Sequence, residues 1–316
     1  MKERYKIFLP FASSAATLLV HVLVPDSPKY TQKSVPYFTD ALIFTTAITA
    51  ACAAVSLYKK KFGAVYAHKS YFYAVALLLI NVYNLATLKL MLIPAIYFPP
   101  IDKILNVFVN DGAFMMKCLA YSTRLLVFGF ALGLVTGLAT GILVGWSKRW
   151  SYWVTPLIKI IGPIPSTAWI PVALVVFATT TQASIFLIAL AVWFPTTLLT
   201  SSGVSNVQNA YFEVGSTLGA NTFQKIFTIA LPAAMPSIFI GVFNGTCASF
   251  LTLMTAEMLG VKFGIGWYIN WQREILAYAN VYAGLITIAV SFSLIITILF
   301  KVRDRLLSWQ KGVIKW

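Results

Sequence analysis

One polar segment of this chain has side chains whose types and spacing suit contact with a partner in water. It is EVGSTLGANTFQKIFTIALP, residues 213–232, in which Glu213 is followed by Gly219 and then by Ile-x-Leu-Pro. Long apolar runs flank it, so a polar stretch of this length must lie outside the lipid. A lone carboxylate, a glycine and apolar side chains can form a docking element for a soluble protein. The segment therefore indicates a transporter driven by a soluble partner.

The rest of the sequence shows no recognisable catalytic centre. No G-x-x-x-x-G-K-[ST] sequence is present, so the chain has no phosphate-binding loop of its own. No Ser-His-Asp arrangement or metal-ligand cluster is apparent, and the three cysteines fit neither a metal site nor a redox pair. We therefore predict a chain that is no enzyme and holds no metal or cofactor of its own.

The composition is that of an integral membrane protein. Of 316 residues, 59% are hydrophobic and only 10% are charged, whereas a soluble domain has about 25% charged residues. We expect an all-α, polytopic membrane protein, whose fifth span is broken or kinked by three prolines. The eight predicted spans are 7–25, 38–58, 71–96, 120–146, 157–178, 182–202, 233–256 and 280–300.

The basic residues predict the orientation of the chain. The net charge is +15, but the lysines and arginines cluster in loops beside apolar spans, which argues against nucleic-acid binding. Eight spans place both termini on one side, and most of the 24 basic residues fall on that side. By the positive-inside rule this side is cytoplasmic. We predict a multi-pass protein of a prokaryotic inner membrane with both termini, and residues 213–232, in the cytoplasm.

Five glycines recur at intervals of four within the fourth span. On a helix they form a ridge without side chains, where a second helix can approach closely. Packing within one subunit is the favoured interpretation, and a dimer seam or a sliding surface is the alternative. The five are Gly129, Gly133, Gly137, Gly141 and Gly145.

Three charged residues are candidates for a pathway or gate. Arg124 opens the fourth span, and Glu257 lies at the outer end of the seventh, where charge is costly unless it is paired or serves a function. Glu257 could line the route or pair with Arg124 or Arg273. The glycines that follow Glu257 predict a sharp turn.

The segment from Glu213 resembles the signature of binding-protein-dependent ABC importer permeases. That signature reads E-A-A, three residues, G, nine residues and I-x-L-P. Val214 and Gly215 depart from its two alanines, but both are small or of modest size. The matching positions are Glu213, Gly219, Ile229, Leu231 and Pro232.

The resemblance covers about residues 72–305 and is closest to the nitrate, sulfonate, taurine and bicarbonate branch. Ala178 stands where a glycine is expected. The other similar segments are FPPIDKIL (98–105), STRLLVFGF (122–130), GPIPSTAWIPVALVVF (162–177), WFPTTLLTSSGV (193–204) and AEMLGVKFGIGWYI (256–269).

The resemblance implies a type I importer permease with a six-span core. The core would be residues 71–305, with a cytoplasmic coupling loop at about 203–232. A two-span extension, 1–70, would precede it and a basic cytoplasmic tail, 306–316, would follow. The extension would brace the permease laterally or recruit another subunit.

The implied partners are two cytoplasmic ABC ATPases, which would bind the ATP, an extracytoplasmic substrate-binding protein, membrane lipid and a second copy of this chain. Within the loop we expect two short helices, about 207–218 and 220–227, joined at Gly219. Glu213 would anchor the ATPase, and Phe223 and Phe227 would pack in its groove or against the membrane. Pro232 would start the next span.

Alternatives remain open at the level of cargo and class. The solute is a small anion, such as nitrate, sulfonate, taurine or bicarbonate, or else a neutral vitamin precursor. An ion-coupled secondary transporter would show an inverted repeat and buried coupling carboxylates, and the sequence shows neither. Residues 207–227 could also form an amphipathic helix at the inner interface, and a membrane scaffold is a third class.

Overall fold

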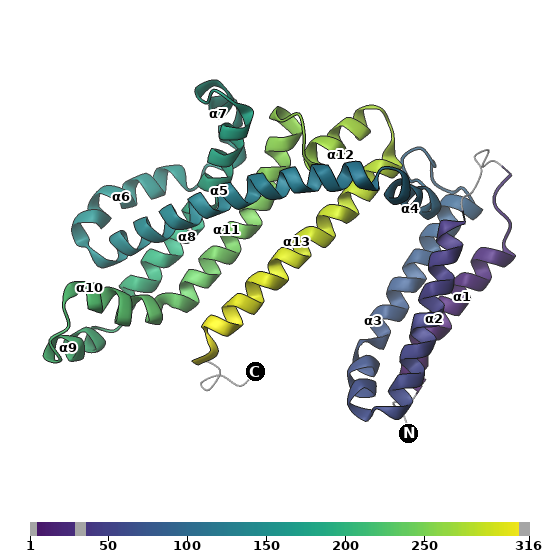
Figure 1. Ribbon diagram of the computed structural model, residues 1–316, viewed down its shortest axis with the longest axis horizontal. Coiled ribbons are helices and arrows are strands. Elements are labelled where there is room, and N and C mark those ends of the chain that lie inside the picture. Colours follow the sequence, from purple (N-terminus) through teal and green to yellow (C-terminus); the bar gives the residue numbers. More distant parts are fainter. Residues whose placement is uncertain (1–4, 29–35, 310–316) are drawn as a thin grey trace. The chain divides into compact units, whose positions relative to one another are not determined.

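The computed structural model describes residues 5–28 and 36–309, and every regular element in this part of the chain is helical. Seven described helices are long and apolar enough to cross a membrane, and a bent helix pair adds an eighth crossing if it counts as one span. The predicted all-α, polytopic fold is therefore confirmed. The chain forms two compact units (Figure 1).

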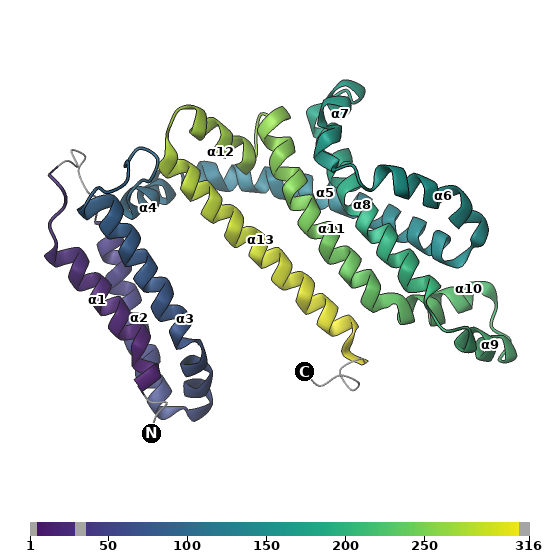
Figure 2. The same ribbon diagram turned by 180° about the vertical axis from the view of Figure 1, so that it is seen from behind.

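The first unit contains the described residues up to Ala113 together with Trp271–Ala283. Its three long helices, α1, α2 and α3, lie side by side in both views (Figures 1 and 2). The elements are η1 (Tyr5–Phe8), α1 (Leu9–Leu23), α2 (Tyr37–Tyr58), α3 (Lys60–Asn84), the π-helical turn η2 (Leu85–Lys89) and α4 (Ile101–Asn110).

The third span was predicted at the wrong position. The apolar run suggested 71–96, whereas the membrane-length helix runs from Lys61 to Lys89. Lysine is a good helix former, so the basic residues after α2 do not delay the start of α3. The domain boundary predicted at residue 70 consequently falls inside this helix.

A buried acceptor on α4 caps the start of α2. Proline 36 precedes this helix and has no side chain that could accept a hydrogen bond, and the Phe38 N–H instead donates to Asp102 Oδ1 at 3.0 Å. Burial raises the pKa of the Asp102 carboxyl, and the hydrogen bond from Phe38 opposes that rise in pKa. Asp102 thus joins α4 to the end of the three-helix bundle.

The second unit contains Phe114–Asn270 and the described residues from Gly284 onward. Residues 310–316 of the predicted basic tail lie outside the described part of the chain. The remaining helices are α5 (Gly112–Trp146), α6 (Lys148–Ile161), η3 (Ser166–Trp169), α7 (Ile170–Val176), α8 (Thr180–Ser205), α9 (Asn209–Thr217), α10 (Thr222–Gln224), the π-helical turn η4 (Lys225–Ala230), α11 (Leu231–Gly260), α12 (Ile265–Glu274) and α13 (Tyr278–Leu306).

The fifth predicted span, 157–178, is a bent pair of helices. α6 stops at Ile161, and the chain turns by 86° before η3 and α7 continue. Pro163 and Pro165 fall in the break, where they cannot supply the N–H groups that a continuous helix needs. A break at this point was expected from the prolines, but the size of the bend was not.

The glycine ridge of α5 packs against α8. A Cβ added at Gly141 would lie 2.6 Å from Thr200 Cβ, and one at Gly129 would lie 2.6 Å from Ile188 Cβ. Added Cβ atoms at the three other ridge glycines would also meet α8, at 3.0 Å or less. The ridge therefore lies inside one subunit, where the two helix backbones approach closely.

Replacing a ridge glycine should destabilise the second unit. We expect Gly141→Ala to lower the stability of the purified protein by about 1–3 kcal/mol, because its methyl group would overlap Thr200. Gly112→Ala, where an added Cβ has no atom within 4 Å, is the matched control. Thermal unfolding in detergent measures both, and equal midpoints for the two variants would contradict the packing argument.

Candidate functional site

The segment that contains Glu213 folds as a short helix, α9, joined by a tight turn to the start of a long helix. α9 ends in a Schellman motif: the Ala220 N–H donates to Gly215 O at 2.9 Å and the Gly219 N–H to Ser216 O at 3.0 Å. Gly219 has φ +78°, a conformation that side chains with a Cβ rarely adopt. The conformation of the turn thus requires glycine at position 219, where the sequence motif also has a glycine.

A capping box begins the second element. The Gln224 N–H donates to Asn221 Oδ1 and the Asn221 N–H to Gln224 Oε1, both at 2.8 Å. Lys225 Nζ then reaches back to Ser216 Oγ at 2.7 Å, which joins the two arms of the turn. The polar residues of the segment therefore mostly satisfy its own backbone and side chains.

Two apolar contacts attach the turn to the membrane helices. Gly215 is buried, and a Cβ there would lie 2.7 Å from Ile229 Cδ1. This close contact explains why the residue at position 215 is small. The rings of Phe212 and Trp146 meet edge to face with centroids 5.4 Å apart. Phe212 also packs against the cluster around Ala230.

The solvent-exposed face of this turn presents a carboxylate among exposed apolar side chains. Glu213 and Val214 are exposed on α9, and Leu218 at its end is 81% exposed. Phe223 is 67% exposed, and its ring packs on that of Phe227 at 4.3 Å between centroids. Exposed apolar patches on a polar loop are typical of a surface that another protein covers.

Two local predictions for this segment need correction. The second short helix, expected over 220–227, is not separate, because helix runs without interruption from Thr222 to Leu259. Pro232 therefore does not begin the span, although it lies in the first turn of α11. The π-helical turn η4 comes just before it, where its wider spacing accommodates a residue that lacks an N–H.

Glu257 is fully buried at the far end of α11, where it caps α12. Its Oε2 accepts the Gly266 N–H at 2.9 Å, and Ser122 Oγ on α5 accepts the Ile265 N–H, also at 2.9 Å. The residue before α12 is Gly264, with φ +131°, where a Cβ would lie 2.5 Å from the Glu257 carboxyl carbon. Two other helices thus supply the cap that glycine cannot.

Arg124 and Glu257, two of the three charged candidates, have different surroundings in the structure. Arg124 is exposed on α5, and within the described residues no ion pair links it to Glu257. Pairing of Glu257 with Arg124, one of the alternatives, is therefore not observed: the carboxylate turns inward to the α12 backbone, while Arg124 is exposed. Arg273 is exposed near the end of α12, in the other compact unit.

A groove of about 340 Å³ lies at the break between α6 and η3. α8 and α11 form its other walls, and Phe194 and Leu251 are among its apolar residues. Its hydrogen-bonding side chains come from Ser166, Thr167, Asn244 and Thr252. Arg124, Glu257 and Arg273 are not among its lining residues, so the groove is mostly apolar, with a few neutral hydrogen-bonding groups and no charged side chain.

Residues 129–309 match the family described as binding-protein-dependent transport system inner membrane component. The chain belongs to this family. The match includes α9, α10 and most of the second unit's membrane helices. The protein is thus the inner-membrane permease component of a binding-protein-dependent ABC importer, and not a catalytic subunit.

Named relatives agree with this assignment, and one solved structure has a similar fold. The taurine transport system permease protein TauC of Escherichia coli is 28% identical over 245 residues, 75% of this chain and 88% of the relative. The nitrate import permease protein NrtB of Synechocystis is 32% identical over 215 residues, 67% and 75% of the two chains. A chain of the inward-facing MetNI methionine ABC transporter shares the fold at a TM-score of 0.51 and 17% identity, over 61% of this chain and 96% of that one.

Ser122 and Trp146 are two positioning residues that sequence reasoning missed. Ser122 lies in the STRLLVFGF segment that resembles the family, but only the structure shows it capping α12. Trp146 ends α5, and nothing in its own neighbourhood predicts a contact with Phe212. Long separations in sequence hide both contacts.

Removing the Glu257 carboxylate should loosen the start of α12. We expect Glu257→Ala to cost about 1–3 kcal/mol, because the buried Gly266 N–H would lose its acceptor. Glu257→Gln retains an acceptor oxygen and should cost less. Unfolding midpoints and hydrogen exchange over residues 262–270 measure the effect. Glu213→Ala, at an exposed carboxylate, is the control, and a Glu257→Ala midpoint equal to it would refute the capping role.

Proposed function

We propose that this permease moves a small anion across the membrane, and that the α9–α10 turn is where its cytoplasmic ATPase docks. The observation that carries the docking proposal is the exposed face formed by Glu213, Leu218 and Phe223, mounted on a turn whose own polar groups are already satisfied. Such a face offers a charged anchor and apolar contacts to a partner, and little conformational entropy is lost on binding because the turn is already ordered.

The proposed assembly has two copies of this chain, two ATPases and an extracytoplasmic binding protein. Both termini and the α9–α10 turn would lie in the cytoplasm, as the distribution of basic residues favours. Closure of the ATPases on ATP would draw the two docked turns together. Because the turn is attached to α5 through Phe212 and Trp146, that movement would pass into the membrane helices.

The groove beside the α6–η3 break suits an anion that must bind and then leave. Asn244, Thr252 and Ser166 offer neutral hydrogen-bonding groups, and Ser166 Oγ already contacts Thr252 Oγ1 at 2.6 Å. Neutral hydrogen-bonding groups can bind an anion weakly enough for it to leave again. Relatives named for nitrate and taurine support a solute of this chemical class.

Two substitutions test the docking surface. We expect Glu213→Ala and Gly219→Val each to weaken ATPase binding at least about tenfold. The first removes the exposed carboxylate, and the second forces a β-branched residue into a positive-φ turn. The measurements are co-purification of the ATPase and the amount of permease in the membrane. Thr123→Ala, exposed on α5, is the control. Normal ATPase recovery with both variants would rule out this surface.

Uptake measurements test the cargo. Cells that depend on this importer should take up nitrate, bicarbonate, taurine or another sulfonate, and uptake should stop when the chain is deleted. Asn244→Leu should lower the uptake rate about tenfold, because the groove loses a hydrogen-bonding group to the anion, while ATPase recovery stays normal. If the cells take up a neutral vitamin precursor and none of these anions, the proposal of an anionic cargo is contradicted.

A further inference from the structure

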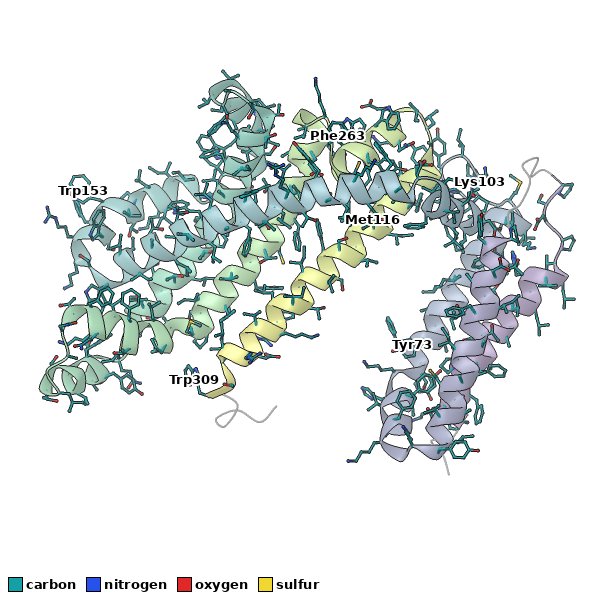
Figure 3. The ribbon with its side chains drawn as sticks, in the orientation of Figure 1. Tyr73, Lys103, Met116, Trp153, Phe263 and Trp309 are labelled. Atoms are coloured by element: carbon teal, nitrogen blue, oxygen red, sulfur yellow. The ribbon has the colours of Figure 1, made fainter. Side chains whose placement is uncertain are left out.

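A second groove, of about 380 Å³, lies in the first unit between α2 and α3. It is outside residues 129–309, the part of the chain that matches the family. Its walls are mostly apolar or aromatic, and Tyr73 of α3, labelled in Figure 3, is one of them. The lining residues are Ile48, Thr49, Cys52, Phe62, Val65, Tyr66, Lys69 and Tyr73.

Tyr66 brings an unpartnered hydroxyl to this groove. The residue is 9% exposed, and its Oη is buried without a hydrogen-bond partner among the described residues. Its ring is fixed, because it packs in a cluster with Ile7 and Ala53 and lies parallel to the Phe62 ring. Buried hydroxyl groups are nearly always hydrogen-bonded in folded proteins. An acceptor from outside the chain would satisfy it.

The groove also has positive charge without a nearby counter-ion. Lys69 lines it, and within the described residues no carboxylate pairs with that ammonium group. Residues 41–101 contain no aspartate or glutamate, although five lysines fall among them. Lys59 and Lys61, both exposed, stand at the end of α2 and the start of α3, near the same end of the groove. An unpaired lysine on a membrane helix requires a partner or access to the interface.

We propose that this groove binds an anionic phospholipid. One acyl chain lies along the apolar walls of the groove. The phosphate accepts a hydrogen bond from the Tyr66 hydroxyl and pairs with Lys69. A free phosphate ion would leave the apolar walls uncovered, and a neutral lipid would leave Lys69 without a counter-ion. The three features together therefore select a lipid that has both a tail and a negative charge.

Native mass spectrometry of the complete importer tests this proposal. The complex is equilibrated with equal amounts of phosphatidylglycerol and phosphatidylcholine that have the same acyl chains. We expect phosphatidylglycerol to be retained about fivefold better, the effect of one lysine near a membrane surface. Lys69→Gln should abolish that preference, and Tyr66→Phe should lower retention of phosphatidylglycerol.

Matched controls isolate the groove from the rest of the surface. Tyr58→Phe changes a hydroxyl that is 89% exposed, and Lys301→Gln removes an exposed charge from α13, so both should behave as wild type. Glycerophosphoglycerol, which lacks acyl chains, should not compete. Equal retention of the two lipids by the wild type, effects shared by the controls, or a bound polypeptide in place of the lipid would overturn the proposal. ATPase recovery is independent of these readouts and reports on the proposed function alone.

Discussion

The close approach of α5 to α8 is the constraint on which the second unit depends. Apolar side chains give two helices in lipid little reason to associate, so close packing must hold them together. Five glycines four residues apart let the backbone of α5 come within contact distance of α8 over more than four turns. A helix held in this way over about half of its length acts as a rigid strut.

The two ends of that strut make the contacts that bear on function. Near one end, Ser122 caps α12 beside Glu257, and at the other, Trp146 packs on Phe212 of the turn that we assign to ATPase docking. The residues from 122 to 146 span roughly 36 Å at 1.5 Å per residue. A movement of the docking turn can therefore reach the α12 cap through one packed element, which is the physical connection that coupling requires.

The sequence was sufficient for the fold class and for the position of the α9–α10 turn, because both depend on local signals. Long apolar runs predict membrane helices, and Gly219 is required by the conformation of its own turn. The failures all involved long-range or competing effects. Lys61 lies within a continuous helix although the apolar run begins ten residues later, and the bend at Pro163 has a size that only packing determines. The partner of Glu257 proved to be a backbone N–H, which no pattern of charged residues can reveal.

Both compact units begin a helix in the same way, and this explains why their buried carboxylates are poor indicators of a transport route. α2 follows a proline and α12 follows a glycine, neither of which has a side chain that can accept a hydrogen bond. The acceptors come from other helices: Asp102 serves α2, and Glu257 with Ser122 serves α12. An acid placed at the positive end of a helix is stabilised there, so burial of these groups has a structural cause. The uncharged groove beside the α6–η3 break is for that reason the better candidate for contact with the solute.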